Sequence, residues 1–156
     1  MEAGEARRAV AAAMSVAAAL GLAVDDAVVL NNSNRLVARL LPCDIVARAS
    51  PIGWFSAARE VEVARRLAEE TDGPVAGLDP RVEPRIVVRD GFEIAMWTYF
   101  EPVQSRALPP GDYAHALEHL HGALRRVDMG APHFTDRLAE IQRWLAEGDA
   151  TPDLTD

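Results

Sequence analysis

The stretch from Val28 to Glu60 constrains the fold more than any other part of this chain. Two short apolar runs, at 27–30 and 35–41, lie at its beginning on either side of a polar sequence. Asn tolerates the left-handed backbone of tight turns better than most residues, so this pattern predicts a hairpin. The residues expected to form its loop are Asn31, Asn32, Ser33 and Asn34.

Periodicity and turn residues place the other elements. In the second run, Leu36, Ala38 and Leu40 alternate with Arg35, Val37 and Arg39, as in a strand with one buried face. Asp90-Gly91 is a strong hairpin signal. We expect strands at 27–30, 35–41, 44–49, 85–88 and 92–97, and helices at 5–20, 57–70, 112–127 and 134–147.

These elements predict an α+β fold with a five-stranded, mostly antiparallel sheet. One helix precedes the sheet and another is inserted after the third strand. A chain of 156 residues allows one domain, or one domain and part of a second. The composition changes after Tyr99, where Pro-rich sequence indicates a linker. We therefore expect a sheet domain over 1–98, a hinge or linker over 99–111, and a partial helical domain over 112–156.

The charge composition narrows the classes of ligand. A net charge of −8 argues against nucleic acid as the main partner, since phosphate backbones require clustered cations. All 16 basic residues are arginine, so any cation that binds phosphate here has to be Arg. Arg binds phosphate oxygens bidentately, whereas Lys acts as a point charge. No uninterrupted stretch is apolar enough over about 20 residues to predict a membrane span.

The cellular compartment is predicted from two weaker features. Cys43 is the only cysteine, which excludes an intrachain disulfide and fits a reducing compartment. The Ala-rich stretch from Ala9 to Val24 resembles a signal-peptide core, but the opening Met-Glu-Ala-Gly-Glu is acidic where a signal peptide is basic. We expect a cytoplasmic protein.

The order of charged groups around the third strand suits a phosphate-binding site. A loop between two strands can cover phosphates with backbone N–H groups, a cation on the next strand can hold their oxygens, and a helix carboxylate can orient that cation. Here Asn31–Asn34 would form the loop, Arg48 would be the cation and Glu60 the carboxylate. Val46 lies two residues before Arg48, on the same face of the strand, and would pack on the base.

Taken together, these motifs resemble the N-terminal part of the aminoglycoside phosphotransferase family, the kinase-like group that includes choline and homoserine kinases. The resemblance covers roughly residues 15–147. It implies a protein-kinase-like N-lobe followed by the first helices of a helical C-lobe. It also implies that ATP and Mg²⁺ serve a transfer of the γ-phosphoryl group to a hydroxyl of a small molecule. The residues that carry it are Leu20–Leu22, Asn31–Arg35, Ile45–Arg48, Arg59-Glu60, Glu93–Trp97 and Leu117–His121.

In a kinase-like site the backbone at the hinge would hydrogen-bond the adenine edge, here around Thr98, Tyr99 and Phe100. The chain departs from the family in two ways. Arg48 stands where the kinase residue is Lys. The later H-x-D-x-x-x-x-N loop and the metal-binding Asp are absent, since no Asp stands two residues after His121. We therefore expect no catalytic residue and no metal ligand in this chain, and no transfer activity from it alone.

Two interpretations remain open at this stage. The chain is the nucleotide-binding part of a longer kinase, or it is a non-catalytic module that binds a protein partner or a second copy through exposed apolar surface on 112–127. Single features also have simpler explanations. The polar loop can be a plain turn, and Arg48 a solvated surface charge. The cluster Trp97–Phe100 can be core, or an aromatic cage for a cation.

Three histidines on one predicted helix are a separate candidate. His115 and His119 share a face and form an H-x-x-E-H pattern with Glu118, which occurs in zinc peptidases. His121 points about 200° away from His119. Two histidines do not make a catalytic zinc site without a third ligand, so we expect a helix whose histidines face solvent or the lobe junction, with His121 packed in or near the core.

Overall fold

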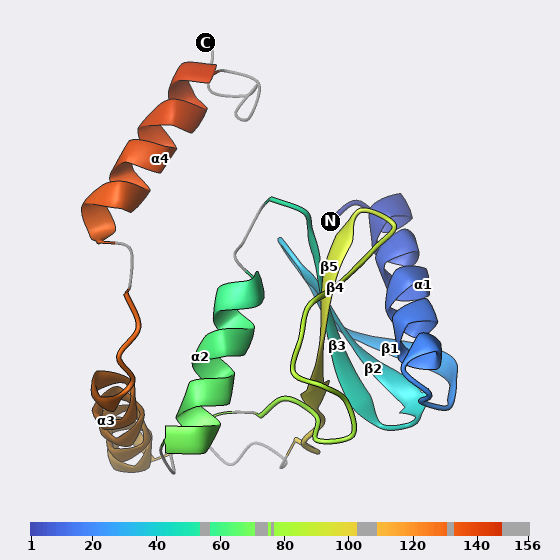
Figure 1. Ribbon diagram of the computed structural model, residues 1–156, viewed down its shortest axis with the longest axis horizontal. Helices are drawn as coiled ribbons and strands as arrows, with labels where there is room; N and C mark the ends of the chain where they lie inside the picture. Colours follow the sequence, from blue (N-terminus) through green and yellow to red (C-terminus); the bar gives the residue numbers. More distant parts are fainter. Residues whose placement is uncertain (54–56, 71–74, 76, 103–108, 131–132, 148–156) are drawn as a thin grey trace.

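The protein is a twisted five-stranded sheet with helices on both faces (Figure 1). The computed structural model describes residues 1–53, 57–70, 75, 77–102, 109–130 and 133–147. The strand order is β1-β2-β3-β5-β4, and every neighbouring pair is antiparallel. The strands are β1 (Val24–Asn32), β2 (Leu36–Pro42), β3 (Ile45–Pro51), β4 (Val87–Arg89) and β5 (Phe92–Thr98).

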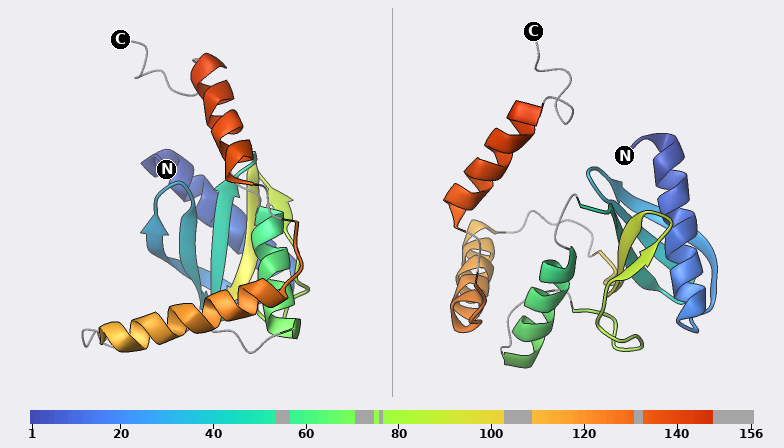
Figure 2. Two further views of the ribbon diagram at one scale, coloured as in Figure 1. Left: turned by 90° about the vertical axis from the view of Figure 1, so that its left-hand side faces the viewer. Right: turned by 45° about the horizontal axis from the view of Figure 1, so that its top comes forward.

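The helices lie in separate layers. Helix α1 crosses one face of the sheet, α2 covers the other face, and α3 lies beyond α2 (Figures 1 and 2). Helix α4 stands clear of the sheet and of α2 in Figure 1. The helices are α1 (Ala3–Ala19), α2 (Ala57–Glu70), α3 (Pro110–Arg126) and α4 (Phe134–Glu147).

The predicted α+β class and five-stranded sheet are confirmed, but several element boundaries differ from the prediction by one to three residues. The first strand continues through Asn32, because Asn31 and Asn32 pair with Val37 and Leu36, so only the second half of the expected loop is a turn. The third helix begins at Pro110, inside the predicted linker. Proline suits this first helical position, because its missing N–H would have no intrahelical partner there.

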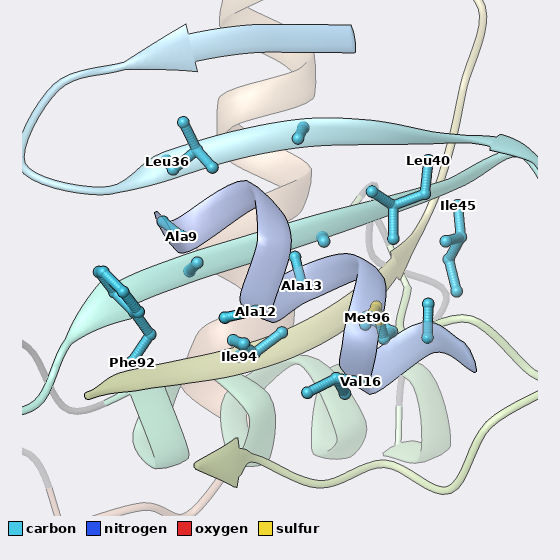
Figure 3. Close-up of a cluster of buried hydrophobic side chains, with 14 residues drawn as sticks. Ala9, Ala12, Ala13, Val16, Leu36, Leu40, Ile45, Phe92, Ile94 and Met96 are labelled. Carbon is cyan, nitrogen blue, oxygen red and sulfur yellow. The ribbon is translucent and has the colours of Figure 1, made fainter. Parts of the chain in front are cut away.

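The main core lies between α1 and the sheet (Figure 3). The helix contributes mostly alanines, whose small side chains let its backbone approach the strands closely. The larger side chains come from the sheet, where Leu36, Leu40, Ile45 and Ile94 are fully buried. The helix residues buried against them are Ala9, Ala12, Ala13, Val16 and Ala17.

A second, smaller cluster lies on the opposite face of the sheet. Val61 and Ala64 of α2 pack against Ala95 and Trp97 of β5. One turn further along α2, Leu67 packs with Ala123 and Val127, which attaches α3 to α2. Helix α2 is therefore the element that links the sheet to the helical region.

The β4–β5 hairpin forms as predicted. Asp90 and Gly91 have φ values of 52° and 85°, and Arg89 pairs with Phe92 across the two-residue turn. Positive φ at both central residues is the type I′ geometry, whose twist matches that of the flanking strands.

The histidine prediction was wrong in one respect. His121 is exposed, not packed in the core. Helix α3 is attached through the side that carries Ala123 and Val127, and His121 points about 200° away from Ala123. Within the described part of the chain, no helix is long and apolar enough to cross a membrane.

Candidate functional site

An open pocket lies on the face of the sheet opposite α1. Its volume is about 410 Å³. Strands β1, β2, β3 and β5 each contribute to it, and the chain segment that leaves β5 closes one end. The lining residues are Leu30, Val37, Val46, Arg48, Trp97, Thr98, Tyr99, Phe100 and Pro102.

The pocket brings together five of the residues predicted from the sequence to bind a nucleotide. Val46 and Arg48 alternate along β3 and face the same side, while Thr98, Tyr99 and Phe100 lie where β5 ends. Trp97 forms the wall between these groups. The Arg48 guanidinium carbon lies 4.7 Å from the centroid of the Trp97 ring, within the range of a cation–π contact.

Glu60 joins the pocket to α2. Its carboxylate accepts a hydrogen bond from Arg48 Nη1 and a second from Arg35 Nη1, the latter at 2.6 Å. All three side chains are about one third exposed, at 33–35%. Glu60 stands in the first turn of α2, where a carboxylate also interacts favourably with the helix dipole. One carboxylate thus positions two guanidinium groups.

The backbone at the end of β5 is partly committed to other contacts. The Thr98 N–H donates to the Gly77 carbonyl at 3.0 Å, and the Thr98 hydroxyl donates to the Leu78 carbonyl at 3.4 Å. Tyr99 and Phe100 donate no backbone hydrogen bond to the described residues. A ligand at this end would therefore find its backbone donors at Tyr99 and Phe100, not at Thr98.

Tyr99 is held by a network of polar contacts. Arg39 lies over its ring, with 3.8 Å from the guanidinium carbon to the ring centroid, and donates to its hydroxyl at 3.1 Å. The hydroxyl in turn donates to Glu101 at 3.0 Å. Arg39 also donates to Asp44 at 2.6 Å, and this hydrogen bond raises the Arg39 pKa. Burial, followed by the hydrogen bond to Glu101, raises the Tyr99 pKa. Tyr99 is a fixed wall of the pocket.

An ion pair between the buried Asp79 and the exposed Arg81 supports the segment beside β5. Asp79 is buried and accepts from the Arg81 backbone N–H and from two nitrogens of its guanidinium, at 2.7–2.9 Å. The Arg81 hydrogen bonds hold the Asp79 pKa below its usual value. Arg81 also donates to the Cys43 carbonyl at 2.6 Å, so the pair links this segment to the β2–β3 turn.

The polar loop lies elsewhere. Ser33 and Asn34 border a different hollow, of about 170 Å³, together with Met1, Glu5 and Pro51. The Met1 amine donates to the Ser33 carbonyl at 2.6 Å, and the Asn32 side chain donates to the Met1 carbonyl at 3.1 Å. None of Asn31, Asn32, Ser33 and Asn34 lines the larger pocket.

The remaining sequence candidates are not gathered into a site. His115, His119 and His121 are all exposed on α3. Among the residues that the structure describes, no three His, Cys, Asp or Glu side chains come close enough together to hold a metal ion.

Sequence reasoning missed three residues on the pocket face of β2 and of the position just before it. Arg35, Val37 and Arg39 lie on the side of the strand opposite Leu36, Ala38 and Leu40. The alternation that predicted the strand also contained this information. The same alternation places Arg35 on the side of the strand that Leu36, Ala38 and Leu40 do not occupy. That placement makes Arg35 a candidate neighbour of Glu60.

Comparison with known proteins supplies no identification. No protein-family model matches the chain, and no curated protein matches it in sequence.

Proposed function

We propose that this chain binds an adenine nucleotide, ATP in the first instance, in the pocket between β2, β3 and β5. In this proposal the chain is the N-lobe and first C-lobe helices of a small-molecule kinase related to the aminoglycoside phosphotransferases. The observation that carries it is the Arg48–Glu60 contact, which joins β3 to α2 beside an apolar pocket at the end of β5.

The chemistry of the pocket changes along its length. Val37, Val46 and Trp97 provide an apolar surface of the kind on which a purine ring packs. The backbone of Tyr99 and Phe100 provides hydrogen-bonding groups for the edge of the base. Arg48 lies two residues from Val46 along β3, a separation of about 6.7 Å, and provides a fork-shaped donor for phosphate oxygens.

Binding and transfer are separate matters in this proposal. The described residues offer no set of carboxylates suited to Mg²⁺, because Glu60 is engaged by two guanidinium groups and no other acidic cluster is present among them. A complete kinase would need a catalytic base and metal-binding carboxylates from outside the described residues. The acceptor, a hydroxyl of a small molecule, would be chosen by that other part.

Titration calorimetry with ATP and with adenosine tests the proposal. Arg48→Ala removes a charge-assisted hydrogen bond worth about 1.5–3 kcal/mol, so ATP affinity should fall about 10- to 150-fold. Adenosine affinity should change much less. Arg8→Ala, an exposed position on α1 across the sheet, is the matched control and should leave both unchanged. Equal ATP affinity in the wild type and Arg48→Ala would refute the assignment.

Helix α4 favours a second candidate function, a non-catalytic module that pairs with a second copy of itself. Phe134, Leu138, Ile141 and Leu145 are all exposed and share one side of the helix. The four positions are symmetric about the midpoint between residues 139 and 140. An antiparallel copy would therefore set Phe134 against Leu145 and Leu138 against Ile141, as a two-fold interface requires.

This row is more extensive than the apolar surface on α3, where Tyr113 and Leu124 are the exposed large apolar residues. Size-exclusion chromatography with light scattering tests the pairing. The wild type should form a dimer that Leu138→Glu dissociates and Ala139→Glu, on the other side of α4, does not. A wild type that stays monomeric at every concentration would rule this function out.

A further inference from the structure

We infer that Arg39 is a positioning residue of this pocket: it holds Tyr99 in place at the end of β5, so that this end takes the neutral ring system of a base and not a cationic ligand. The inference rests on the proposed nucleotide site and adds the charge that the ring of its ligand can carry. Arg39 does not line the pocket; it acts through Tyr99, which does.

Arg39 reaches Tyr99 across a neighbouring strand. It lies on β2 and pairs with Val46 of β3, which in turn pairs with Trp97 of β5. Directly paired residues project from the same face of a sheet, and Val46 lines the pocket, so Arg39 lies on the pocket face. Its guanidinium carbon lies 3.8 Å from the centroid of the Tyr99 ring, and Nη1 donates to the Tyr99 hydroxyl at 3.1 Å.

Arg39 is itself held by other side chains. Its Nε donates to Asp44, which precedes β3, at 2.6 Å. Glu101 lies 3.6 Å from Arg39 Nη1 and accepts from the Tyr99 hydroxyl at 3.0 Å. The guanidinium and the tyrosine ring are therefore fixed relative to each other before any ligand arrives. A side chain that is ordered before binding avoids part of the entropy loss that binding would otherwise bring.

Tyr99 depends on this network because the sheet does not hold it. Strand β5 ends at Thr98, which is the last of its residues to pair with β3. The Tyr99 N–H donates no hydrogen bond to the described residues. The contacts of its side chain therefore fix the position of Tyr99. Without Arg39, we expect both the ring and the adjoining backbone to move more freely where they would meet the base.

The same contacts decide which ring charge the pocket favours. Aromatic side chains bind a cationic ligand through their ring faces. Here Arg39 lies over Tyr99, and Arg48 lies over Trp97 with 4.7 Å between the guanidinium carbon and the ring centroid. Each of these two rings already has a cation of the chain on one face. A second cation gains less from such a ring, whereas a neutral ring can still stack on it. The geometry therefore disfavours the aromatic cage for a cation that the sequence left open.

Calorimetric titration of adenosine, ATP and inorganic tripolyphosphate into the wild type and Arg39→Gln tests the positioning role. Adenosine and ATP affinity should fall by the same factor, about 3- to 10-fold, the effect of ordering one freed side chain on binding. Tripolyphosphate has no base and should bind both proteins equally, which also shows that the variant is folded. Arg39→Lys keeps a cation for the ring and should lose less than Arg39→Gln. Arg8→Gln, at an exposed position on α1, is the control and should match the wild type.

A double-mutant cycle shows whether Arg39 acts through Tyr99. Tyr99→Ala alone should weaken adenosine binding. In the Tyr99→Ala background, Arg39→Gln should cause no further loss, because residues that act as one unit are not additive. A further loss of the full size would overturn the inference.

Tetramethylammonium tests the preference for a neutral ring. The wild type should show no binding at concentrations of tetramethylammonium that match those at which adenosine saturates the pocket. Tetramethylammonium that binds as tightly as adenosine would overturn the inference, since the pocket would then be a cage for cations.

The inference and the proposed function fail in different ways. If the wild type binds adenosine and ATP, and Arg39→Gln binds both as tightly, the inference fails and the nucleotide site stands. Equal losses for adenosine and tripolyphosphate have the same meaning, because Arg39 would then only support the fold. A wild type that binds neither adenosine nor ATP refutes the nucleotide site and overturns the inference with it.

Discussion

The contacts of Glu60 make a quantitative prediction about stability. Glu60→Gln keeps the size of the side chain and one acceptor oxygen but removes the charge that attracts Arg35 and Arg48. In the variant, the two guanidinium groups lose the negative charge that Glu60 places between them. The substitution should therefore destabilise the packing of α2 on the sheet.

The size of the expected stability loss follows from how far the three side chains are buried. A hydrogen bond to a charged group contributes about 1.5–3 kcal/mol when it is well buried, whereas an exposed ion pair contributes about 0–1 kcal/mol. These side chains are one third exposed and are screened by solvent, so each contact is placed in the upper half of the exposed range, at about 0.5–1 kcal/mol. The two contacts together predict a loss of about 1–2 kcal/mol. For a chain of this size the midpoint of thermal unfolding should fall by about 2–8 °C.

Urea unfolding, followed by circular dichroism, measures the loss directly. Double-mutant cycles with Arg35→Gln and Arg48→Gln separate the two contacts, since residues in one network do not contribute additively. Raising the ionic strength to about 1 M shortens the Debye length to about 3 Å and should reduce the effect. Glu69→Gln is the control, because among the described residues Glu69 bonds to Arg65 alone, one turn away on α2. This substitution should cost less than about 0.5 kcal/mol.

The reasoning is refuted if Glu60→Gln is as stable as the wild type at low salt. It is also refuted if the loss is the same at high salt, since the effect would then come from shape and not from charge.

Two other predictions concern the core and acid stability. Leu36→Ala, at a fully buried position between α1 and the sheet, should lower the free energy of unfolding, measured with urea, by about 2–5 kcal/mol. A loss below about 1 kcal/mol would show that the core closes over the cavity. The hydrogen bonds from Arg65 and Arg66 lower the Glu62 pKa to about 2 from a usual 4.5, so the unfolded chain binds the proton more readily. Stability should therefore decline as the pH falls from about 4.5 to about 2, and Glu62→Gln should flatten that decline; an equally steep decline in the variant would contradict the assignment.

Much of the fold could be predicted from local sequence. The fourth helix was predicted with the same bounds as it has in the structure, because its apolar residues recur with helical spacing. The Asp90-Gly91 hairpin was predicted because a type I′ turn needs two residues that tolerate positive φ. The end of β1 at Asn32 was not predicted, because pairing with Leu36 extends the strand into residues that favour turns.

Only part of the candidate site could be predicted from the sequence. Val46, Arg48 and the end of β5 could be grouped, because strand alternation fixes which residues share a face. The place of the polar loop could not be predicted, because it depends on how α1 brings Met1 to Ser33. The involvement of Arg35 was missed, because its contact with Glu60 joins residues 25 positions apart on different elements.

Sequence alone determined the number and type of the helices and strands. It also determined that any cation at a phosphate site is a guanidinium group, because the chain contains no lysine. These properties depend on composition and on contacts between near neighbours in the chain. Only the tertiary structure decided that Glu60 holds two arginines and that the polar loop lies outside the pocket. Such contacts exist only once the sheet has been assembled and α1 and α2 have packed on its opposite faces, and no local pattern encodes those distances.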